Sequence, residues 1–357
     1  MRKGILSLTA LTAAAALTLT ACGDDSDDSG GAAAKGKVGV ILPDPTSSTR
    51  YESFDRPYLE QAFKAAGVQY DIQNAEGSTQ RFQTIADQML TGGVTVLAVD
   101  GLDSNSAAAV QRKARAQGVK TIDYDRLTLG GVGDYYVSFD NVKVGEDLGK
   151  GLQKCLGDKQ SNIVYLNGSP TDNNATLFAQ GAHSVLDKVT TYTKVAEQAV
   201  PDWKADKAAT IFEQMWTGQH GKIDGVLAAN DAVGNAAVSI LSKNKSAGKV
   251  AVTGQDATLQ GLQNILDGNQ CMTVYKPVKQ EADALAKLAV SLIKGEKGET
   301  NGTAHDPEGK RDVPSVLLTP IPVYKDGVKQ VVDDGFIKKA DLCKGAYAAK
   351  CTDAGIK

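Results

Sequence analysis

The feature that most constrains the fold is a unit that recurs from Lys37 onward: a short apolar run, a polar turn and a segment with helical spacing. The apolar runs lack strict alternation of apolar and polar residues, as is typical of strands covered on both faces. They lie at residues 38–42, 94–99, 120–122, 163–166, 225–229 and 250–253. Strands and helices that alternate in this way predict a doubly wound, parallel α/β fold.

Apolar residues three and four positions apart predict the helices between these runs. The clearest helical faces are 82–90, 259–266 and 285–292, and glycines at 67, 92, 118 and 268 fall where helices should end. About 320 residues follow Lys37, which is too many for one such sheet, so we expect two lobes. The chain should cross between them at 136–141 and 272–277.

The N-terminus has the features of an export signal. Arg2 and Lys3 precede an apolar run at 5–19, which is too short to span a bilayer comfortably. The run ends in Leu-Thr-Ala-Cys at 19–22, which resembles the lipobox of bacterial lipoproteins and implies cleavage after residue 21 and lipidation of Cys22. Residues 22–35 contain four aspartates and no large apolar side chain, so we expect a flexible tether. The protein would then lie outside the cytoplasm, anchored to the outer face of the cell membrane.

The charge balance argues against nucleic acid as a partner. The chain has 39 basic and 42 acidic side chains, a net charge of -3, whereas nucleic-acid binding needs a basic surface. The three histidines are isolated from other metal-ligand residues, so we expect no metal, and no motif implies a cofactor.

Polar residues gather directly after the apolar runs, where ligands bind to open parallel sheets. They occur at 44–57, 100, 123–126, 167–175, 230–231 and 255–256. The mixture of Asp, Asn and Arg offers both acceptors and donors, which a neutral sugar needs when it leaves water. No glycine-rich phosphate loop is present. Any one of these Asp or Asn residues could instead cap the following helix.

Two aromatic residues, Trp203 and Tyr51, could offer flat faces to a sugar ring. For Trp203, packing at the edge of a lobe is an equally good interpretation. Trp216 continues the helical spacing of Ile211 and Met215, so we expect it in the core rather than in a site.

The ordered motifs DYDR (123–126), SFDN (138–141), NGSPTDNNA (167–175), AAND (228–231), GQDA (254–257) and MTVYKP (272–277) resemble those of the D-xylose-binding proteins of bacterial ABC sugar-uptake systems. These are type I periplasmic binding proteins. The resemblance implies two α/β lobes, here 36–140 with 276–316 and 141–275 with 317–357, joined by three hinge segments around an enclosed monosaccharide. It also implies delivery of D-xylose by a monomeric binding protein to a membrane permease, without catalysis.

The resemblance implies a sugar pocket shared by the two lobes and the hinge. Its residues would be Arg50, Tyr51, Asp125, Arg126, Asp172, Asn174, Trp203, Asn230, Asp256 and Lys276. Trp203 and Tyr51 would sandwich the ring. The first loop departs from the family pattern because it has one extra residue before the second arginine, so Arg50 and Arg56 could exchange roles.

Apart from Cys22, four cysteines remain, an even number for an oxidising compartment. Cys343 and Cys351 suit a local bridge, and by elimination Cys155 pairs with Cys271 unless both are free buried thiols. Two other functions stay open: a sugar-sensing ectodomain that serves a membrane sensor, and a secreted sugar-processing enzyme.

Overall fold

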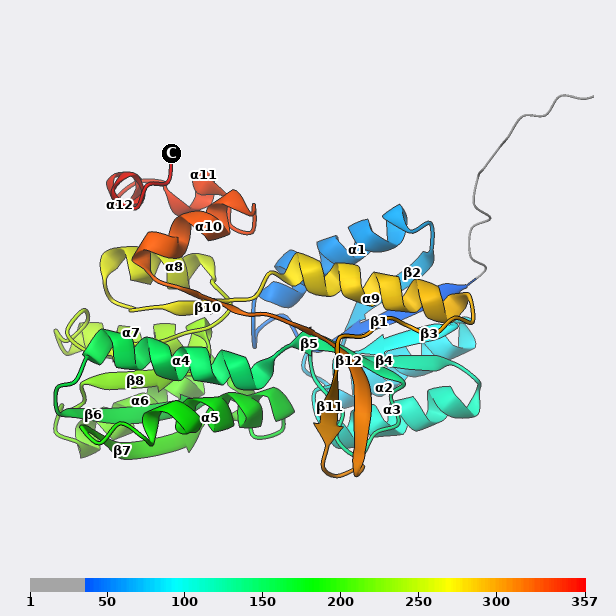
Figure 1. Cartoon of the computed structure of the whole chain (residues 1–357), viewed down its shortest axis with the longest axis horizontal. Coiled ribbons are helices and arrows are strands. Elements are labelled where there is room, and N and C mark those ends of the chain that lie inside the picture. The colour runs from blue at the N-terminus through cyan, green and yellow to red at the C-terminus, as the bar shows by residue number, and fades with distance from the viewer. Residues whose placement is uncertain (1–35) are drawn as a thin grey trace, which may run out of the picture. The chain divides into compact units, whose positions relative to one another are not determined.

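The computed structural model describes residues 36–357, which belong to one compact unit (Figure 1). The predicted signal sequence at 1–21, the lipidation site at Cys22 and the tether at 22–35 lie outside the described residues. Within 36–357, no helix is both long and apolar enough to cross a bilayer.

The first sheet has seven strands in the order β11-β12-β5-β4-β3-β1-β2. All neighbours are parallel except β11, which runs antiparallel to β12. The strands are β1 (Lys37–Leu42), β2 (Gln69–Asn74), β3 (Val96–Val99), β4 (Lys120–Tyr124), β5 (Tyr135–Phe139), β11 (Gly302–Asp306) and β12 (Arg311–Leu318).

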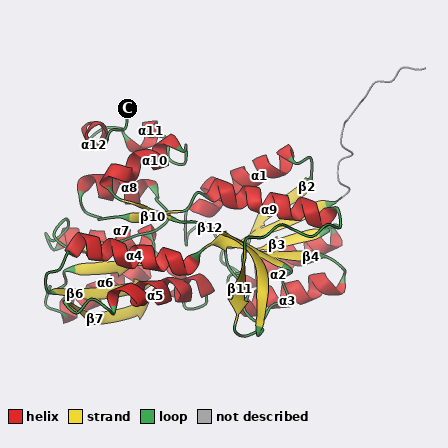
Figure 2. Cartoon of the chain, viewed as in Figure 1, coloured by secondary structure: helices red, strands yellow, loops and turns green. Residues whose placement is uncertain are grey.

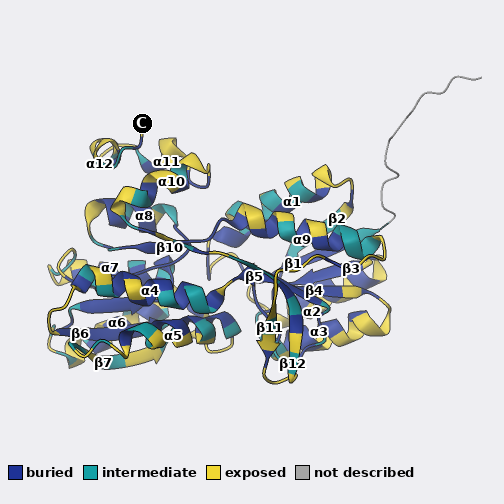
Figure 3. Ribbon diagram, in the orientation of Figure 1, coloured by how far each residue is buried: buried dark blue, intermediate teal, exposed yellow. Residues whose placement is uncertain are grey.

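Helices cover both faces of this sheet (Figure 2). They are α1 (Arg56–Ala65) and α9 (Val278–Ile293) on one face, and α2 (Thr79–Thr91) and α3 (Ser104–Ala116) on the other. Leu285 of α9 packs in one core with Val40, and Met89 of α2 packs in another with Leu97. Because both faces are covered, the central strands are almost wholly buried (Figure 3).

The second sheet has four parallel strands in the order β7-β6-β8-β9. The strands are β6 (Ser161–Asn167), β7 (Tyr192–Ala199), β8 (Gly225–Ala228) and β9 (Ala251–Val252). The helices around it are α4 (Asn141–Leu156), α5 (Asn173–Leu186), α6 (Ala205–Gly218) and α7 (Asp231–Lys243). One apolar core joins these elements.

The C-terminal part packs around a two-stranded antiparallel ribbon of β10 (Thr273–Tyr275) and β13 (Ile321–Val323). The helices here are α8 (Leu259–Asp267), α10 (Val328–Asp333), α11 (Lys339–Leu342) and α12 (Tyr347–Asp353), and a short turn at Lys325–Gly327 precedes α10. These elements share an apolar core. Phe336 of this part stacks on Phe54, with ring centroids 4.0 Å apart.

The chain passes between the sheets three times. It leaves the first sheet between β5 and α4, returns at Lys276 and Pro277 between β10 and α9, and leaves again between β12 and β13. The last passage follows Leu318, since Leu317 and Leu318 still pair with β5.

Two disulfides join the four remaining cysteines. Cys155 at the end of α4 is bonded to Cys271, which lies two residues before the ribbon begins at Thr273. Cys343 is bonded to Cys351, eight residues later in α12. The structure therefore contains both bridges considered from the sequence.

The predicted α/β class with parallel sheets is confirmed. The repeat did not reveal β2 and β7, because both lie at sheet edges and are largely exposed or half-buried. It also missed the β11–β12 hairpin. At the end of α2, Gly93 rather than Gly92 takes the positive φ of 77° that favours glycine.

Candidate functional site

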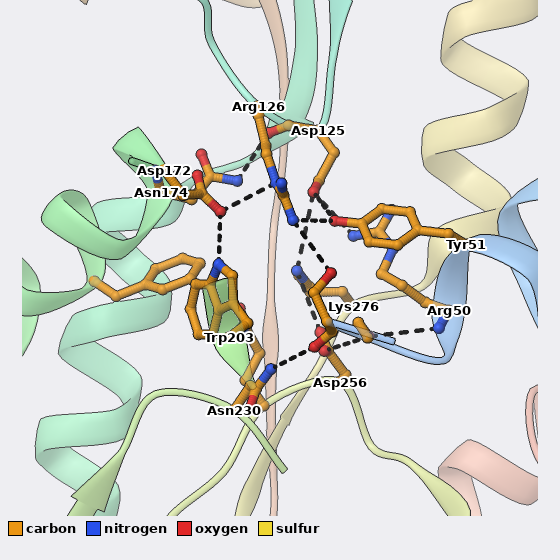
Figure 4. Close-up of a pocket in the computed structure, with 14 residues that line it drawn as sticks. Arg50, Tyr51, Asp125, Arg126, Asp172, Asn174, Trp203, Asn230, Asp256 and Lys276 are labelled. Carbon is orange, nitrogen blue, oxygen red and sulfur yellow. Dashed lines mark hydrogen bonds and ion pairs between the residues drawn. The ribbon is translucent and has the colours of Figure 1, made fainter. Parts of the chain in front are cut away.

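One pocket lies at the carboxyl ends of the strands, and 14 residues from both sheets line it (Figure 4). All ten residues predicted from the sequence are among the lining residues: Arg50, Tyr51, Asp125, Arg126, Asp172, Asn174, Trp203, Asn230, Asp256 and Lys276. Four lining residues were not predicted, namely Ser47, Ser48, Phe178 and Gln255.

The first loop is shaped by Asp44, whose carboxylate accepts hydrogen bonds from Thr46 N at 2.7 Å and Ser47 Oγ at 2.6 Å. The loop leads into a π-helical turn at Tyr51–Asp55, where Arg56 N donates to Tyr51 O. A π turn accommodates one residue more than an α turn, which fits the extra residue that the sequence showed here.

This turn separates the two candidate arginines. Arg50 is buried at the pocket, whereas Arg56 lies outside it and pairs with Glu52 at 2.7 Å. The Arg56 side chain also donates to Ile72 O at 2.7 Å. Of the two alternatives left open by the sequence, the structure places Arg50 in the pocket.

Asp125 follows β4 and is an acidic group at the centre of the pocket's contacts. Its Oδ1 accepts from Arg50 Nη1 at 2.9 Å, its Oδ2 accepts from Tyr51 Oη at 2.9 Å, and Lys276 Nζ lies 4.0 Å away. Burial by itself would raise the pKa of Asp125, but the positive charges of Arg50, Lys276 and Arg126 outweigh burial and hold it well below its usual value. Asp125 is therefore an ionised acceptor at neutral pH.

Arg126 connects the two sheets. Its Nε lies 3.0 Å from Asp172 Oδ2 of the second sheet and 3.4 Å from Asp100 Oδ1 of the first. Its Nη2 lies 3.2 Å from Tyr51 Oη. Burial raises the pKa of both Asp100 and Asp172, against the opposing charge of Arg126.

Two side chains of the second sheet combine helix capping with a place in the pocket. Asp172 caps α5 through Oδ1, which accepts from Asn174 N at 2.9 Å, while its Oδ2 accepts from Trp203 Nε1 at 3.1 Å. Asn230 caps α7 through Oδ1, and its Nδ2 donates to Ser47 O at 3.2 Å. The capping and ligand interpretations of these residues are thus compatible, because different atoms of each side chain serve each role.

Asp256 and Lys276 complete the pocket next to the passage between the sheets. Lys276 Nζ lies 3.3 Å from Asp256 Oδ1, and Ser48 Oγ donates to Asp256 Oδ2 at 2.8 Å. Asn174 Nδ2 reaches from the second sheet to Asp125 O at 2.9 Å. Side chains of the two sheets therefore meet directly around the pocket.

Aromatic rings form part of the wall. Trp203 is buried and lies edge-on to Phe178, with centroids 6.4 Å apart. The Tyr51 ring lies beside the guanidinium groups of Arg50 and Arg126, at 5.3 and 5.7 Å. A ring sandwich between Trp203 and Tyr51 stays a prediction. Trp216 lies outside the pocket, half-buried against Phe212.

Three lining residues have a backbone in the left-handed region: Asp125 with φ 59°, Trp203 with φ 57° and Asp256 with φ 92°. None is glycine, and such conformations cost of order 1 to 3 kcal/mol each. The surrounding structure therefore holds these three side chains in set directions at the pocket.

The site combines three cations and three carboxylates with amide, hydroxyl and aromatic groups, so it can offer a donor and an acceptor to each hydroxyl of a small neutral ligand. Within residues 36–357, no group of three or more His, Cys, Asp or Glu side chains is arranged to hold a metal ion.

Of the missed lining residues, Phe178 lies one helical turn after Asn174 on α5, and Gln255 directly precedes Asp256. Helical spacing could have indicated Phe178, whereas Gln255 belongs to the polar pair 255–256 that the sequence already singled out. Ser47 and Ser48 lie within the polar loop that the sequence did single out.

Comparison with known proteins gives a consistent result. Residues 38–297 match the family described as "Periplasmic binding protein domain". The chain is 36% identical over 310 residues to the D-xylose-binding periplasmic protein of Escherichia coli (strain K12), covering 86% of this chain and 92% of that protein. It is 32% identical to the multiple sugar-binding periplasmic receptor ChvE of Rhizobium radiobacter, covering 96% and 100%. A carbohydrate transporter solute-binding protein from Chloroflexus aurantiacus, solved with D-glucose, superposes with a TM-score of 0.79 at 29% identity, covering 85% of this chain and 97% of that one.

Proposed function

The chain belongs to the periplasmic binding protein domain family, and we propose that it is an extracytoplasmic solute-binding lipoprotein that captures D-xylose for an ABC permease. The observation that carries this proposal is the convergence of ten predicted residues, from distant parts of the sequence, on one buried polar pocket.

A neutral monosaccharide suits this pocket better than an anion. Arg50, Arg126 and Lys276 are already matched by Asp125, Asp172 and Asp256, so no net positive charge is left for a phosphate or carboxylate.

The monosaccharide that we propose as the ligand is D-xylose. The relative from Escherichia coli is named for D-xylose, whereas the solved structure from Chloroflexus aurantiacus holds D-glucose. We assign D-xylose because the higher identity is to the D-xylose-binding protein. One hydroxymethyl group separates the two sugars, so the ranking is open to direct measurement.

The mechanism we propose is closure of two lobes, 36–140 with 276–316 and 141–275 with 317–357. Asp125 and Asp256 come from different lobes, so a sugar held by one lobe gains its remaining partners only when the lobes close. A ligand that binds the closed state better shifts the equilibrium toward it. A permease can then recognise the closed form.

We also propose a membrane anchor and a monomeric state for the protein. Lipid on Cys22 would hold the protein at the outer face of the membrane, with residues 22–35 as the tether. We propose that it acts as a monomer without catalysis. Its carboxylates support binding rather than acid–base chemistry because they are matched by cations.

A thermal-shift panel of pentoses and hexoses tests the function. We expect D-xylose to raise the melting temperature most, because a ligand that binds only the folded state stabilises it by mass action. The sugar should be recovered unchanged after incubation, as judged by NMR. No shift with any sugar would contradict the proposed function, and a larger shift with glucose would correct only the substrate.

Tryptophan fluorescence gives a second prediction, because the sequence has two tryptophans and only Trp203 lines the pocket. The Trp216→Phe variant, which keeps Trp203, should change its emission when xylose is added. The Trp203→Phe variant should show almost no change, because Trp216 lies on α6 outside the pocket. The opposite pattern would remove Trp203 from the sugar site.

A further inference from the structure

Behind the pocket wall, a group of acidic side chains holds Arg50. Asp55 accepts from Arg50 through both oxygens, at 2.9 Å from Nε and 2.7 Å from Nη2, and Asp55 Oδ1 also accepts from Tyr124 Oη at 2.6 Å. Glu281 Oε2 accepts from Arg50 Nη2. Asp55 and Glu281 are both fully buried, and neither lines the pocket.

Arg50 uses four of its five N–H groups in hydrogen bonds within the protein. A guanidinium carries five N–H groups in a fixed plane. Nε and Nη2 together donate three bonds to Asp55 and Glu281, and Nη1 donates one to Asp125, so four are used within the protein. The fifth belongs to Nη1, the nitrogen beside the pocket residue Asp125. The acidic group therefore fixes the direction in which Arg50 can donate to a ligand.

We propose that Glu281 is a positioning residue for sugar binding: it holds the Arg50 guanidinium so that its remaining N–H is presented to the sugar. The inference rests on the proposed function. Glu281 lies in the first turn of α9, five residues after Lys276, which lies in the hinge just before this helix begins at Val278. Glu281 thereby links Arg50 to the passage between the sheets.

Packing alone gives no reason for a carboxyl group at this position. Glu281 is 0% exposed, and its Oε1 has no hydrogen-bond partner among the described residues. Apolar side chains of similar size are often as stable as buried ion pairs or more so. The role that we assign to this carboxyl is to orient Arg50, which an apolar residue could not do.

The same geometry predicts a pH dependence of sugar affinity. Glu281 faces Arg50 and Asp55 from the first loop, Asp125, Tyr124 and Tyr136 from the neighbouring strands, and Lys276 from the hinge. Burial, reinforced by the charges of Asp125 and Asp55 and opposed by Arg50, raises the pKa of Glu281 to about 8.

The coupling between proton binding at Glu281 and sugar binding determines whether affinity rises or falls with pH. Closure around a sugar excludes water, which disfavours the charged carboxylate and raises the pKa of Glu281 further in the complex than in the open protein. Sugar binding is then accompanied by proton uptake at Glu281. The affinity for the sugar is therefore highest at pH values below the pKa that Glu281 has in the open protein. It falls as pH rises through about 8, by at most about tenfold per pH unit for one proton.

The test is calorimetric titration of the full chain with D-xylose from pH 6.5 to 9.5. We expect the wild-type dissociation constant to rise several-fold between pH 7 and 9. Glu281→Gln, which resembles the protonated form, should bind as well as wild type at pH 7 but lose this pH dependence. Glu281→Leu should bind at least about tenfold more weakly at every pH, because Arg50 loses a charge-assisted acceptor. Asp283→Asn, an exposed site on the same helix, is the matched control and should follow wild type.

The outcomes separate this inference from the proposed function. If wild type binds no sugar at pH 7, the function fails and the inference with it. If wild type binds but its affinity is flat from pH 7 to 9, or Glu281→Gln keeps the wild-type profile, Glu281 has no positioning role. Affinity of Glu281→Leu within about twofold of wild type would overturn it as well. Should Glu281→Leu not fold, the wild-type and Glu281→Gln profiles still decide.

Discussion

Replacing Asp125 with alanine should weaken D-xylose binding by about 100- to 1,000-fold. Its carboxylate is the acceptor for Arg50 and Tyr51, and its pKa is held well below the usual value, so it is charged throughout the neutral range. In the complex, a sugar hydroxyl that donates to this carboxylate would be left unpaired by the substitution, and losing one partner of a buried charged hydrogen bond across an interface costs about 2–5 kcal/mol. Calorimetric titration of the purified variant would measure the loss.

The experiment needs a variant that separates binding from backbone strain. Asp125 has φ 59°, where alanine is disfavoured but asparagine is tolerated. Asp125→Asn keeps the shape and loses the charge, so it should also bind much more weakly while melting near wild type. Asp87→Ala removes an exposed carboxylate of α2 that pairs with Lys113, and it should not change affinity. Unchanged affinity in a folded Asp125→Ala variant would show that Asp125 does not contribute to sugar binding.

The pocket could be predicted because the fold places its residues by a simple rule. The carboxyl ends of parallel strands meet at one edge, so polar residues after separate strands converge even when they are distant in sequence. Asp125 follows β4 and Asn230 follows β8, and both reach the same pocket. Capping and binding do not compete at Asn230. Its Oδ1 caps α7, while its Nδ2 points toward the first loop and donates to Ser47 O.

The parts that escaped prediction depend on contacts between elements rather than on local pattern. Nothing in the sequence around Glu281 relates it to Arg50, because the two meet only when α9 packs beside α1 and the first loop. The choice between Arg50 and Arg56 likewise depended on a π-helical turn, which rotates one arginine into the pocket and the other away. Edge strands such as β7 lack the two-sided burial that makes a strand visible as an apolar run.

The largest stability effect should come from the Cys155–Cys271 bridge. The two cysteines are 116 residues apart, and closing a loop of about 100 residues is worth about 4.7 kcal/mol in the chain-entropy model. The Cys155→Ser/Cys271→Ser variant should therefore lose about 3–5 kcal/mol of unfolding free energy, as measured by urea denaturation. Neither cysteine lines the pocket, so xylose affinity should stay within about twofold of wild type.

The second bridge provides the matched control. Cys343 and Cys351 are only 8 residues apart, so the same model assigns their bridge less than the roughly 3 kcal/mol of a 15-residue loop. Cys343→Ser/Cys351→Ser should destabilise the protein less than Cys155→Ser/Cys271→Ser. Mass spectrometry of the unreduced protein after thiol labelling tests the premise itself. If Cys155 and Cys271 are labelled, the bridge is not formed in solution, and the stability difference between the two variants can then reflect only packing around the serines.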